Sequence, residues 1–117
     1  MNRPADCLFC KIVDRQIPSA MVYENEDVFG FKDANPQAPV HILFVPKKHI
    51  PGVHVINSSD QDSVQRLVLA ATSVAREHGV EESGYRLVIN CRKEGGQTVD
   101  HLHLHLLGGR KMNWPPG

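Results

Sequence analysis

The stretch His101-Leu102-His103-Leu104-His105-Leu106-Leu107 alternates histidine with leucine. Successive side chains of a β-strand point to opposite faces, so a strand over 101–107 would place all three imidazoles on one face and the leucines on the other. The leucine face can be buried in a core. The other face would hold three groups that titrate near neutral pH, spaced about 6–7 Å apart along the backbone. The stretch therefore predicts a core strand that also carries a chemical site.

The polar loop over 91–98, just before this strand, has features of an anion-binding loop. It contains Gly95-Gly96, and glycine lets backbone amides approach an anion closely. Most glycine pairs only form turns, so the signal depends on the short distance between this loop and His101. The residues that could contact such an anion are Asn90, Gly96, Gln97 and Thr98.

Turn residues and hydrophobic periodicity divide the rest of the chain into short elements. A long helix is expected to begin with Ser58 or Ser59 as its N-cap and to end near Gly79, where a C-cap belongs. The other expected elements are a short helix over 4–13 and strands over 21–24, 28–32, 41–45 and 85–90. Short connections between neighbouring strands favour antiparallel pairing. We therefore expect an α+β fold with a five-stranded, mostly antiparallel sheet, one long helix and one short helix.

Size and charge exclude several classes of protein. The 117 residues fit a single domain over 1–117, in which 108–117 form a tail. Thirteen Lys and Arg balance thirteen Asp and Glu, so a basic field for nucleic acid or for a membrane surface is absent. No apolar run has the length of a membrane span, and residues 1–6 lack the apolar core of a signal peptide. We expect a cytoplasmic protein with no nucleic-acid or membrane partner.

The histidine strand fits two chemistries. A neutral imidazole is a competent nucleophile toward phosphorus and a good leaving group afterwards. Its attacking nitrogen must be unprotonated while an acceptor holds the other nitrogen, and a neighbouring imidazole or the Thr98 hydroxyl could assist the phosphoryl group. However, His-x-His on a strand also binds metals, and zinc held by three imidazoles and a water is a hydrolytic site. The spacing alone leaves both chemistries open.

Cys7-Leu8-Phe9-Cys10 adds a second candidate site. A Cys-x-x-Cys pair can bind one zinc ion if two further ligands come from elsewhere in the chain, and histidine candidates are plentiful. The alternatives are two buried free thiols or a redox-active pair, although no thioredoxin-like context follows. An odd count of three cysteines argues against a disulfide framework.

Taken together, the motifs resemble the histidine-triad (HIT) superfamily, in which histidines alternate with apolar residues. The tail over 108–117 is similar to that of the HINT branch, the histidine-triad nucleotide-binding proteins. The segments that match in family order are Phe9-Cys10-Lys11-Ile12, 33–41, Val45-Pro46-Lys47-Lys48-His49-Ile50, 95–99 and 101–107. The resemblance therefore covers nearly the whole chain and implies a HIT-like fold.

The resemblance implies a homodimeric phosphoramidase that acts on purine nucleoside 5′-phosphoramidates. His103 would attack the α-phosphorus and form a nucleotidyl intermediate, which water then hydrolyses. His105 would bind the phosphoryl group, while His41 and His101 would complete the histidine network. Thr98 stands where the family usually has serine, so it retains the hydroxyl and adds a methyl group. The implied catalytic residues are thus His41, Thr98, His101, His103 and His105.

The resemblance also assigns the nucleotide and the metal. Apolar side chains would line the base pocket, Asp33 would accept from the ribose hydroxyls, and the tail could cover the partner's site. The implied nucleotide-binding residues are Leu8, Phe9, Ile12, Phe31, Asp33, Ala34, Asn90, Gly96, Gln97, Thr98, His103, His105 and Trp114. The Cys-x-x-Cys pair matches a zinc-binding subset, with one structural zinc per chain and no catalytic cofactor. The implied zinc ligands are Cys7, Cys10, His49 and His101.

Two other functions are compatible with the same pocket. One is hydrolysis of dinucleoside polyphosphates, against which the tail argues. The other is a regulatory module that binds AMP or GMP and turns substrate over only incidentally. A histidine at position 105 argues against the nucleotidyl-transferase branch, which places glutamine there.

Overall fold

Strand β3 (Val40–Pro46) lies at the centre of the fold in the computed structural model, which describes residues 4–117. All of its residues except Val40 are buried, as expected for a strand covered on both faces. It pairs antiparallel with β2 (Val28–Lys32) and with β5 (Leu104–Gly108). Residues 1–3, which belong to the domain predicted over 1–117 and to the segment 1–6 discussed above, lie outside the described residues.

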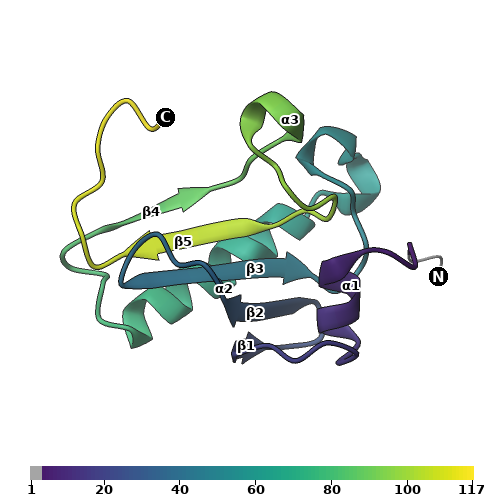
Figure 1. Ribbon diagram of the computed structural model, residues 1–117, viewed down its shortest axis with the longest axis horizontal. Helices are drawn as coiled ribbons and strands as arrows, with labels where there is room; N and C mark the ends of the chain where they lie inside the picture. The colour runs from purple at the N-terminus through teal and green to yellow at the C-terminus, as the bar shows by residue number, and fades with distance from the viewer. Residues whose placement is uncertain (1–3) are drawn as a thin grey trace.

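The sheet has five strands in the order β1-β2-β3-β5-β4, as Figure 1 shows. The edge strands are β1 (Met21–Glu24) and β4 (Tyr85–Val88), and every neighbouring pair is antiparallel. The turn from β1 to β2 is closed by Asn25, whose Oδ1 accepts from the backbone N–H groups of Asp27 and Val28. The predicted α+β fold and antiparallel sheet are confirmed.

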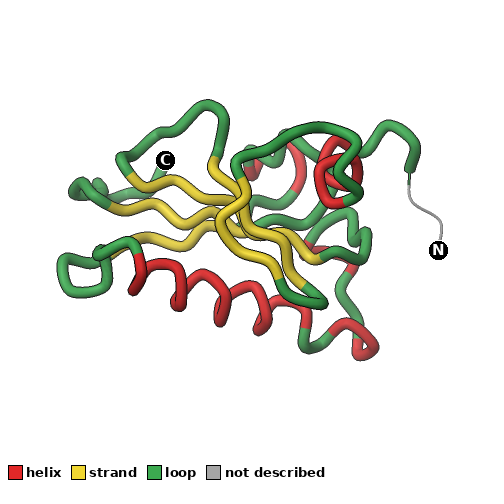
Figure 2. Tube along the Cα trace, turned by 90° about the horizontal axis from the view of Figure 1, so that it is seen from below, coloured by secondary structure: helices red, strands yellow, loops and turns green. Residues whose placement is uncertain are grey.

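Helix α2 (Ser63–Glu77) covers one face of the sheet (Figure 2). Its apolar residues recur at helical spacing, so Leu67, Ala71 and Val74 are fully buried in the same core as Leu104 and Leu106. Gly79 follows the helix with φ = 73°, a left-handed conformation that favours glycine and ends the helix as predicted.

The opposite face of the sheet carries helix α1 (Leu8–Val13). Phe9 and Ile12 of α1 are buried in a second apolar cluster with Phe29 and Phe31 of β2. The histidines of the 101–105 segment face this second cluster, since the rings of His101 and His103 both contact Phe9. The alternating stretch therefore separates two layers, with leucines toward α2 and histidines toward α1.

Both predicted helix starts are wrong. The helix predicted over 4–13 begins only at Leu8, because Cys7 caps it: the Cys7 Sγ accepts from the Cys10 backbone N–H at 3.3 Å. The long helix begins at Ser63 instead of after Ser58 or Ser59. Residues Ser58–Asp60 form the separate 3-10 turn η2, which Asn57 caps through its side-chain oxygen. A second 3-10 turn, η1, spans Val53–Val55.

Three predicted boundaries near the site also change. The strand predicted over 85–90 ends at Val88, and the predicted loop over 91–98 contains the single-turn helix α3 (Arg92–Gly95). The strand predicted over 101–107 joins the sheet only from Leu104. Before Leu104 the chain takes other partners: the Leu102 N–H donates to the Ile50 carbonyl, and the Pro46 carbonyl contacts the ring of His101.

No helix within residues 4–117 has the length and apolar character needed to cross a membrane.

Candidate active site and metal centre

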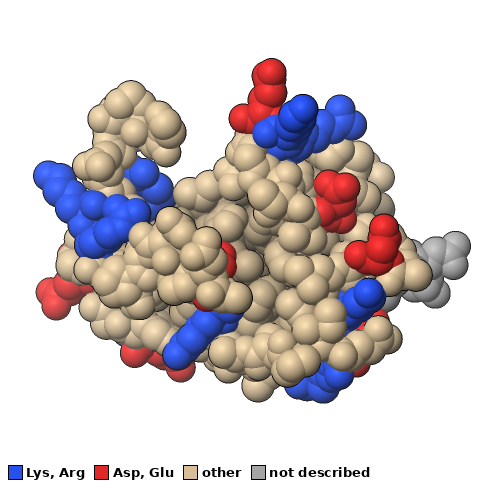
Figure 3. Space-filling view, viewed as in Figure 1, with Lys and Arg blue, Asp and Glu red and all other residues tan. Residues whose placement is uncertain are grey.

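A cavity of about 400 Å³ opens on the histidine face of the sheet. Its walls come from α1, β2 and β3, from the segment before β1, from the loop after β2, and from the residues before and within β5. Of the predicted nucleotide-binding residues it contains Leu8, Phe9, Ile12, Phe31, Asp33, Ala34, Thr98, His103 and His105. The middle of this face is hollowed and largely uncharged (Figure 3), which suits a flat, apolar ligand beside a small polar group.

Four of the predicted nucleotide-binding residues do not line this cavity: Asn90, Gly96, Gln97 and Trp114. The Gln97 amide instead shapes the loop, because its Nε2 donates to the carbonyls of Pro51 and Val99 at 2.8 and 3.0 Å. Its Oε1 accepts from the Arg92 backbone N–H. Trp114 is 83% exposed and lies outside the lining of this cavity.

His103 has the geometry of a nucleophile. Its Nδ1 lies 2.7 Å from the carbonyl oxygen of His101, and a carbonyl only accepts, so Nδ1 carries the proton. In the neutral ring Nε2 then keeps its lone pair. His103 is 5% exposed, and the ring of Phe9 packs edge-on against its ring with centroids 5.0 Å apart. Burial lowers the pKa of His103, which keeps the ring uncharged and its lone pair available.

His105 has the opposite tautomer, which a chain of hydrogen bonds imposes. The Gln37 backbone N–H donates to His41 Nδ1 at 3.0 Å, so a neutral His41 carries its proton on Nε2. That Nε2–H donates to His105 Nδ1 at 3.0 Å, so a neutral His105 carries its own proton on Nε2. This last nitrogen is buried and has no hydrogen-bond partner among the described residues. The cavity therefore holds a lone pair on His103 beside an unused N–H donor on His105.

The lowered pKa values of His41 and His105 are consistent with neutral rings, which the tautomer assignment requires. Burial and the neighbouring His103 and His41 rings lower the pKa of His105 to about 4. Burial also lowers the pKa of His41, against the opposing effect of Asp33, whose Oδ2 lies 3.4 Å from His41 Nε2. The His41 and His105 rings are therefore neutral near pH 7.

Acidification is expected to destabilise the fold through His105. The unfolded ring has its ordinary pKa of 6.5 and the folded ring one of about 4, so between these values the unfolded chain binds more protons. The free energy of unfolding therefore rises with pH in this window and falls on acidification. Between pH 7 and pH 5 the free energy of unfolding should fall by about 1–2 kcal/mol more in the native chain than in the His105→Gln variant, as measured by urea unfolding at each pH. Both proteins retain the same zinc ligands, so acid release of metal affects them alike, and equal losses would contradict the expectation.

The geometry disfavours a catalytic metal held by the three histidines. The ring of His101 contacts the cysteines, and the Nδ1 of His103 is bound to a carbonyl, so the rings do not converge on one point. Asp33, His41 and His105 do lie close enough to hold an ion. However, the Gln37 N–H places the proton of His41 on Nε2, the nitrogen that would have to coordinate. A proton therefore occupies this position in the neutral network.

A second group of side chains has the donor set of a structural zinc site. The Cys7 and Cys10 Sγ atoms and the His49 and His101 Nδ1 atoms all lie within 4.8 Å of one another, and all four side chains are at least partly buried. Both predicted cysteines and both predicted histidines are thus brought together. The Nε2 of His101 lies 2.8 Å from the Pro46 carbonyl, which places its proton there and puts the lone pair on Nδ1, the atom that faces the other three donors.

The distances between these donor atoms fit zinc. A tetrahedral ion with Zn–S and Zn–N bonds of ordinary length requires donor–donor separations of about 3.3 to 3.8 Å. The Nδ1 atoms of His49 and His101 are 3.2 Å apart, and Cys10 Sγ lies 3.2 and 3.5 Å from them. Cys7 Sγ lies 3.3 Å from His101 Nδ1. Such an ion would join α1 to the histidine segment and would use four protein ligands, leaving no position for an activated water.

Sequence reasoning missed several residues of the site. The Gln37 N–H and the Pro46 carbonyl fix ring tautomers, but they are backbone groups that any residue carries, so no sequence signal marks them. The cavity is also lined by Pro18, Ser19, Ala20, Lys32, Leu43 and Val99. Leu43 could have been found, because it alternates along β3 with residues of the other face.

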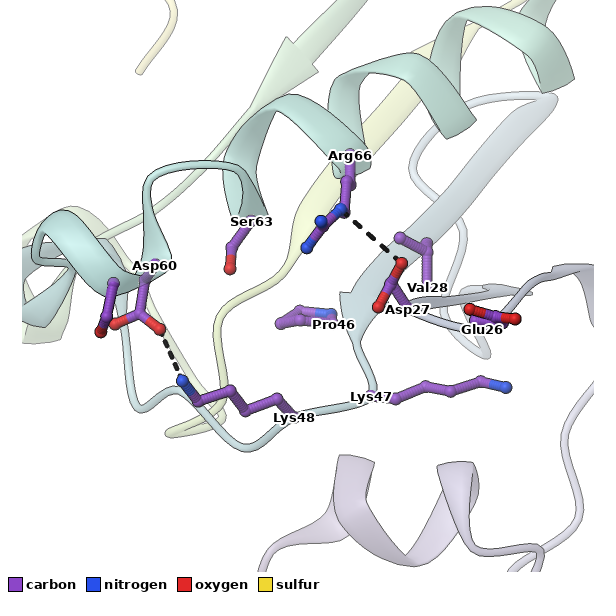
Figure 4. A pocket seen from close by; sticks show the side chains of 10 residues that line it. Glu26, Asp27, Val28, Pro46, Lys47, Lys48, Asp60, Ser63 and Arg66 are labelled. Carbon is purple, nitrogen blue, oxygen red and sulfur yellow. Dashed lines mark hydrogen bonds and ion pairs between the residues drawn. The ribbon is translucent and has the colours of Figure 1, made fainter.

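Another cavity of about 330 Å³ lies beside the start of α2 (Figure 4). It is lined by charged residues, several of which are paired: Lys48 contacts Asp60 at 2.7 Å, and Arg66 contacts Asp27 at 3.6 Å. It holds no histidine or cysteine. Because its cations already face carboxylates, it offers little net attraction to an anion, and the histidine cavity is the better candidate.

Comparison with known proteins agrees with this geometry. A family model described as HIT domain matches residues 14–112. An uncharacterized HIT-like protein of Synechocystis sp. is 50% identical over 112 residues, which cover 96% of this chain and 97% of that protein. A 14 kDa zinc-binding protein of Brassica juncea is 46% identical over 114 residues, covering 96% and 100% of the two chains. The crystal structure of a HIT family hydrolase from Legionella pneumophila superposes with a TM-score of 0.93 at 47% identity, covering 96% and 100%. The chain belongs to the HIT family.

Proposed function

We propose that this protein is a hydrolase of purine nucleoside 5′-phosphoramidates, of the kind found in the HINT branch. One observation carries the proposal: the lone pair of a buried neutral His103 and the unused Nε2–H of His105 share one cavity. The first group can attack phosphorus, and the second can donate to a phosphoryl oxygen. A solved relative from Legionella pneumophila carries the description of a HIT family hydrolase, which supports the reaction class.

In the first step His103 Nε2 attacks the α-phosphorus, and the bond from phosphorus to the amine nitrogen breaks. The leaving nitrogen takes up a proton from solvent, relayed by the Thr98 hydroxyl at the mouth of the cavity, and departs as a neutral amine. The positive charge that develops on His103 is stabilised because its Nδ1–H donates to the His101 carbonyl. The His105 Nε2–H meets the negative charge on the phosphoryl oxygens.

In the second step a water molecule attacks phosphorus and displaces His103 Nε2. The water loses one proton to solvent, the bond between Nε2 and phosphorus breaks, and the nucleoside monophosphate leaves. The proton consumed in the first step equals the proton released in the second, so the cycle balances. His103 returns to the neutral tautomer that the His101 carbonyl selects.

The nucleotide would sit with its base against α1. Phe9, Ile12 and Phe31 present an apolar wall that suits a large purine, and the half-buried carboxylate of Asp33 can accept from ribose hydroxyls. Asn90, Gly96 and Gln97 stay predictions on the phosphate side. The homodimer, in which Trp114 and the tail would reach the partner's site, and the cytoplasmic location also stay predictions.

We propose one structural zinc per chain at Cys7, Cys10, His49 and His101. The donor distances support it, and so does the similarity to a zinc-binding protein of Brassica juncea. The bound ion would supply no chemistry beyond fixing the geometry of its ligands. It would hold Phe9, which lies between the two cysteines in sequence, against the ring of His103.

The substrate class is tested with a panel. Adenosine 5′-phosphoramidate, its guanosine and cytidine counterparts, and diadenosine polyphosphates are each given to the purified protein, and nucleoside monophosphate release is measured. We expect the purine phosphoramidates to be turned over faster than the diadenosine polyphosphates, and about tenfold faster than the cytidine compound, because an apolar wall distinguishes bases by about 1–3 kcal/mol. Faster cleavage of diadenosine polyphosphates would assign the chain to that reaction instead. Tight AMP binding without turnover of any compound would favour a regulatory module.

A further inference from the structure

The segment that follows β5 packs on the loop that precedes β3. Gly108 pairs with Val40, so the chain leaving β5 meets the loop over 33–39 at the same end of the sheet (Figure 1). Gly109 has φ = 90°, and a Cβ placed there would lie 2.8 Å from Pro39 Cβ, which only glycine allows. The next residue, Arg110, donates from its Nε to the Gln37 carbonyl at 2.9 Å.

Gln37 is also the residue that sets the tautomers of the site. Its backbone N–H is the donor to His41 Nδ1, and His41 in turn donates to His105. Arg110 therefore holds the carbonyl of a residue whose N–H decides where two protons lie. The other side-chain bonds within the loop, from the Asn35 N–H to Asp33 and from the Gln37 amide to the Asn35 carbonyl, are local to the loop. The Asp33 backbone N–H also closes the loop by donating to the His41 carbonyl at 3.0 Å, while the Arg110 bond and the Gly109 contact connect the loop to the end of β5.

We propose that Arg110 is a positioning residue that fixes the tautomers of His41 and His105 through Gln37. The two tautomers of a neutral imidazole differ little in free energy, so one well-placed donor decides between them. If the Gln37 N–H moves away, His41 can carry its proton on Nδ1 and accept at Nε2. His105 must then donate from Nδ1, and its Nε2 presents a lone pair to the cavity in place of a donor. The charged and titratable groups facing this pair are Asp33 and His103; the Asp33 carboxylate, 3.4 Å from His41 Nε2, favours the native tautomer, so loss of Arg110 is expected to give a mixture of the two tautomers.

The proposal is tested by ¹⁵N NMR of the histidine rings, which reports which nitrogen carries the proton. In Arg110→Ala we expect a second tautomer at His41 and His105, while His103, whose proton is fixed by the His101 carbonyl, keeps its signal. Arg110→Lys retains an N–H donor on a long stem and should restore much of the native signal. Arg86→Ala is the matched control, because Arg86 donates to the Asn113 carbonyl in the same tail but not to the loop over 33–39. It should leave the His41 and His105 signals unchanged.

A second readout rests on the proposed function. The kcat for adenosine 5′-phosphoramidate should fall about 3- to 10-fold in Arg110→Ala, as expected for partial loss of one hydrogen bond to the reacting group. The thermal midpoint should stay close to that of the native chain, since the arginine is exposed. Native tautomers in Arg110→Ala, or the same tautomer change in Arg86→Ala, would overturn the proposal. If no version of the protein hydrolyses the substrate, the proposed function fails, and the NMR result still decides the role of Arg110.

Discussion

Replacing His103 with alanine is expected to lower phosphoramidase turnover by at least about 10⁴-fold. The proposed reaction forms a bond between His103 Nε2 and phosphorus, and removing a nucleophile costs several orders of magnitude because no neighbouring group can replace it. His105 is close, but its tautomer presents an N–H instead of a lone pair to the cavity. AMP should still bind to the variant within about tenfold of the native affinity, because the base and ribose contacts come from other residues.

The measurement combines steady-state kinetics with calorimetric titration of AMP. His54→Ala is the matched control: His54 lies in η1, is exposed and does not line the histidine cavity, so its loss should not change turnover. In the native protein, a slowly hydrolysed substrate should leave a nucleotide adduct on the peptide that contains His103. Near-native turnover by His103→Ala, or an adduct mapped to another side chain, would refute the mechanism.

Replacing Cys10 with alanine is expected to remove zinc and much of the stability of the fold. Cys10 Sγ contacts both histidine donors of the cluster, so its loss leaves at most three ligands. Metal analysis of freshly purified native protein should find about one zinc per chain, and the variant less than about a tenth of that. The free energy of unfolding should drop by at least about 3 kcal/mol, because a structural zinc binds only the folded chain.

Cys91→Ala provides the control for the Cys10 variant. Cys91 is the remaining cysteine, is only partly buried, and lies outside the cluster, so its replacement should change neither zinc content nor stability by much. Denaturant unfolding of the native chain and both variants compares the three. Two results would contradict the structural zinc site. One is a Cys10→Ala protein as stable as the native chain; the other is less than about a tenth of a zinc per chain in native protein purified without chelator.

The parts of the fold predicted from sequence are those set by local pattern. Alternation over 101–107 separates leucine from histidine whichever residue first joins the sheet, so the division between the two layers is correct although the strand begins at Leu104. The start of α2 is different, because Ser58, Ser59 and Asp62 are all residue types that favour helix N-caps. The choice among them is made by distant contacts, such as that of Asp60 with Lys48, which hold η2 as a separate turn.

In the site, too, local sequence pattern predicts some features while contacts between distant residues determine the others. The spacing of Cys7 and Cys10 marks them as a candidate metal-binding pair. Their contacts with His49 and His101 span up to 94 residues, so the sequence could suggest these partners only through resemblance to a family. The tautomers of His41 and His105 depend on the Gln37 backbone N–H, a group with no signature of its own. The kinds of side chain present at the site were therefore predictable from the sequence, whereas the nitrogen that carries the proton in each ring could be assigned only from the three-dimensional structure.

The alternation of leucine and histidine makes core packing and the chemistry of the site depend on the same spacing of residues along the strand. Deleting or inserting a single residue within 102–104 would turn His101 and His105 to opposite faces, so that imidazole would lie among the leucines beneath α2. Such a change would disrupt core packing and chemistry together, whereas replacing one side chain by another can alter either alone. Related proteins should therefore differ in this segment by substitutions, and they should keep its length unchanged.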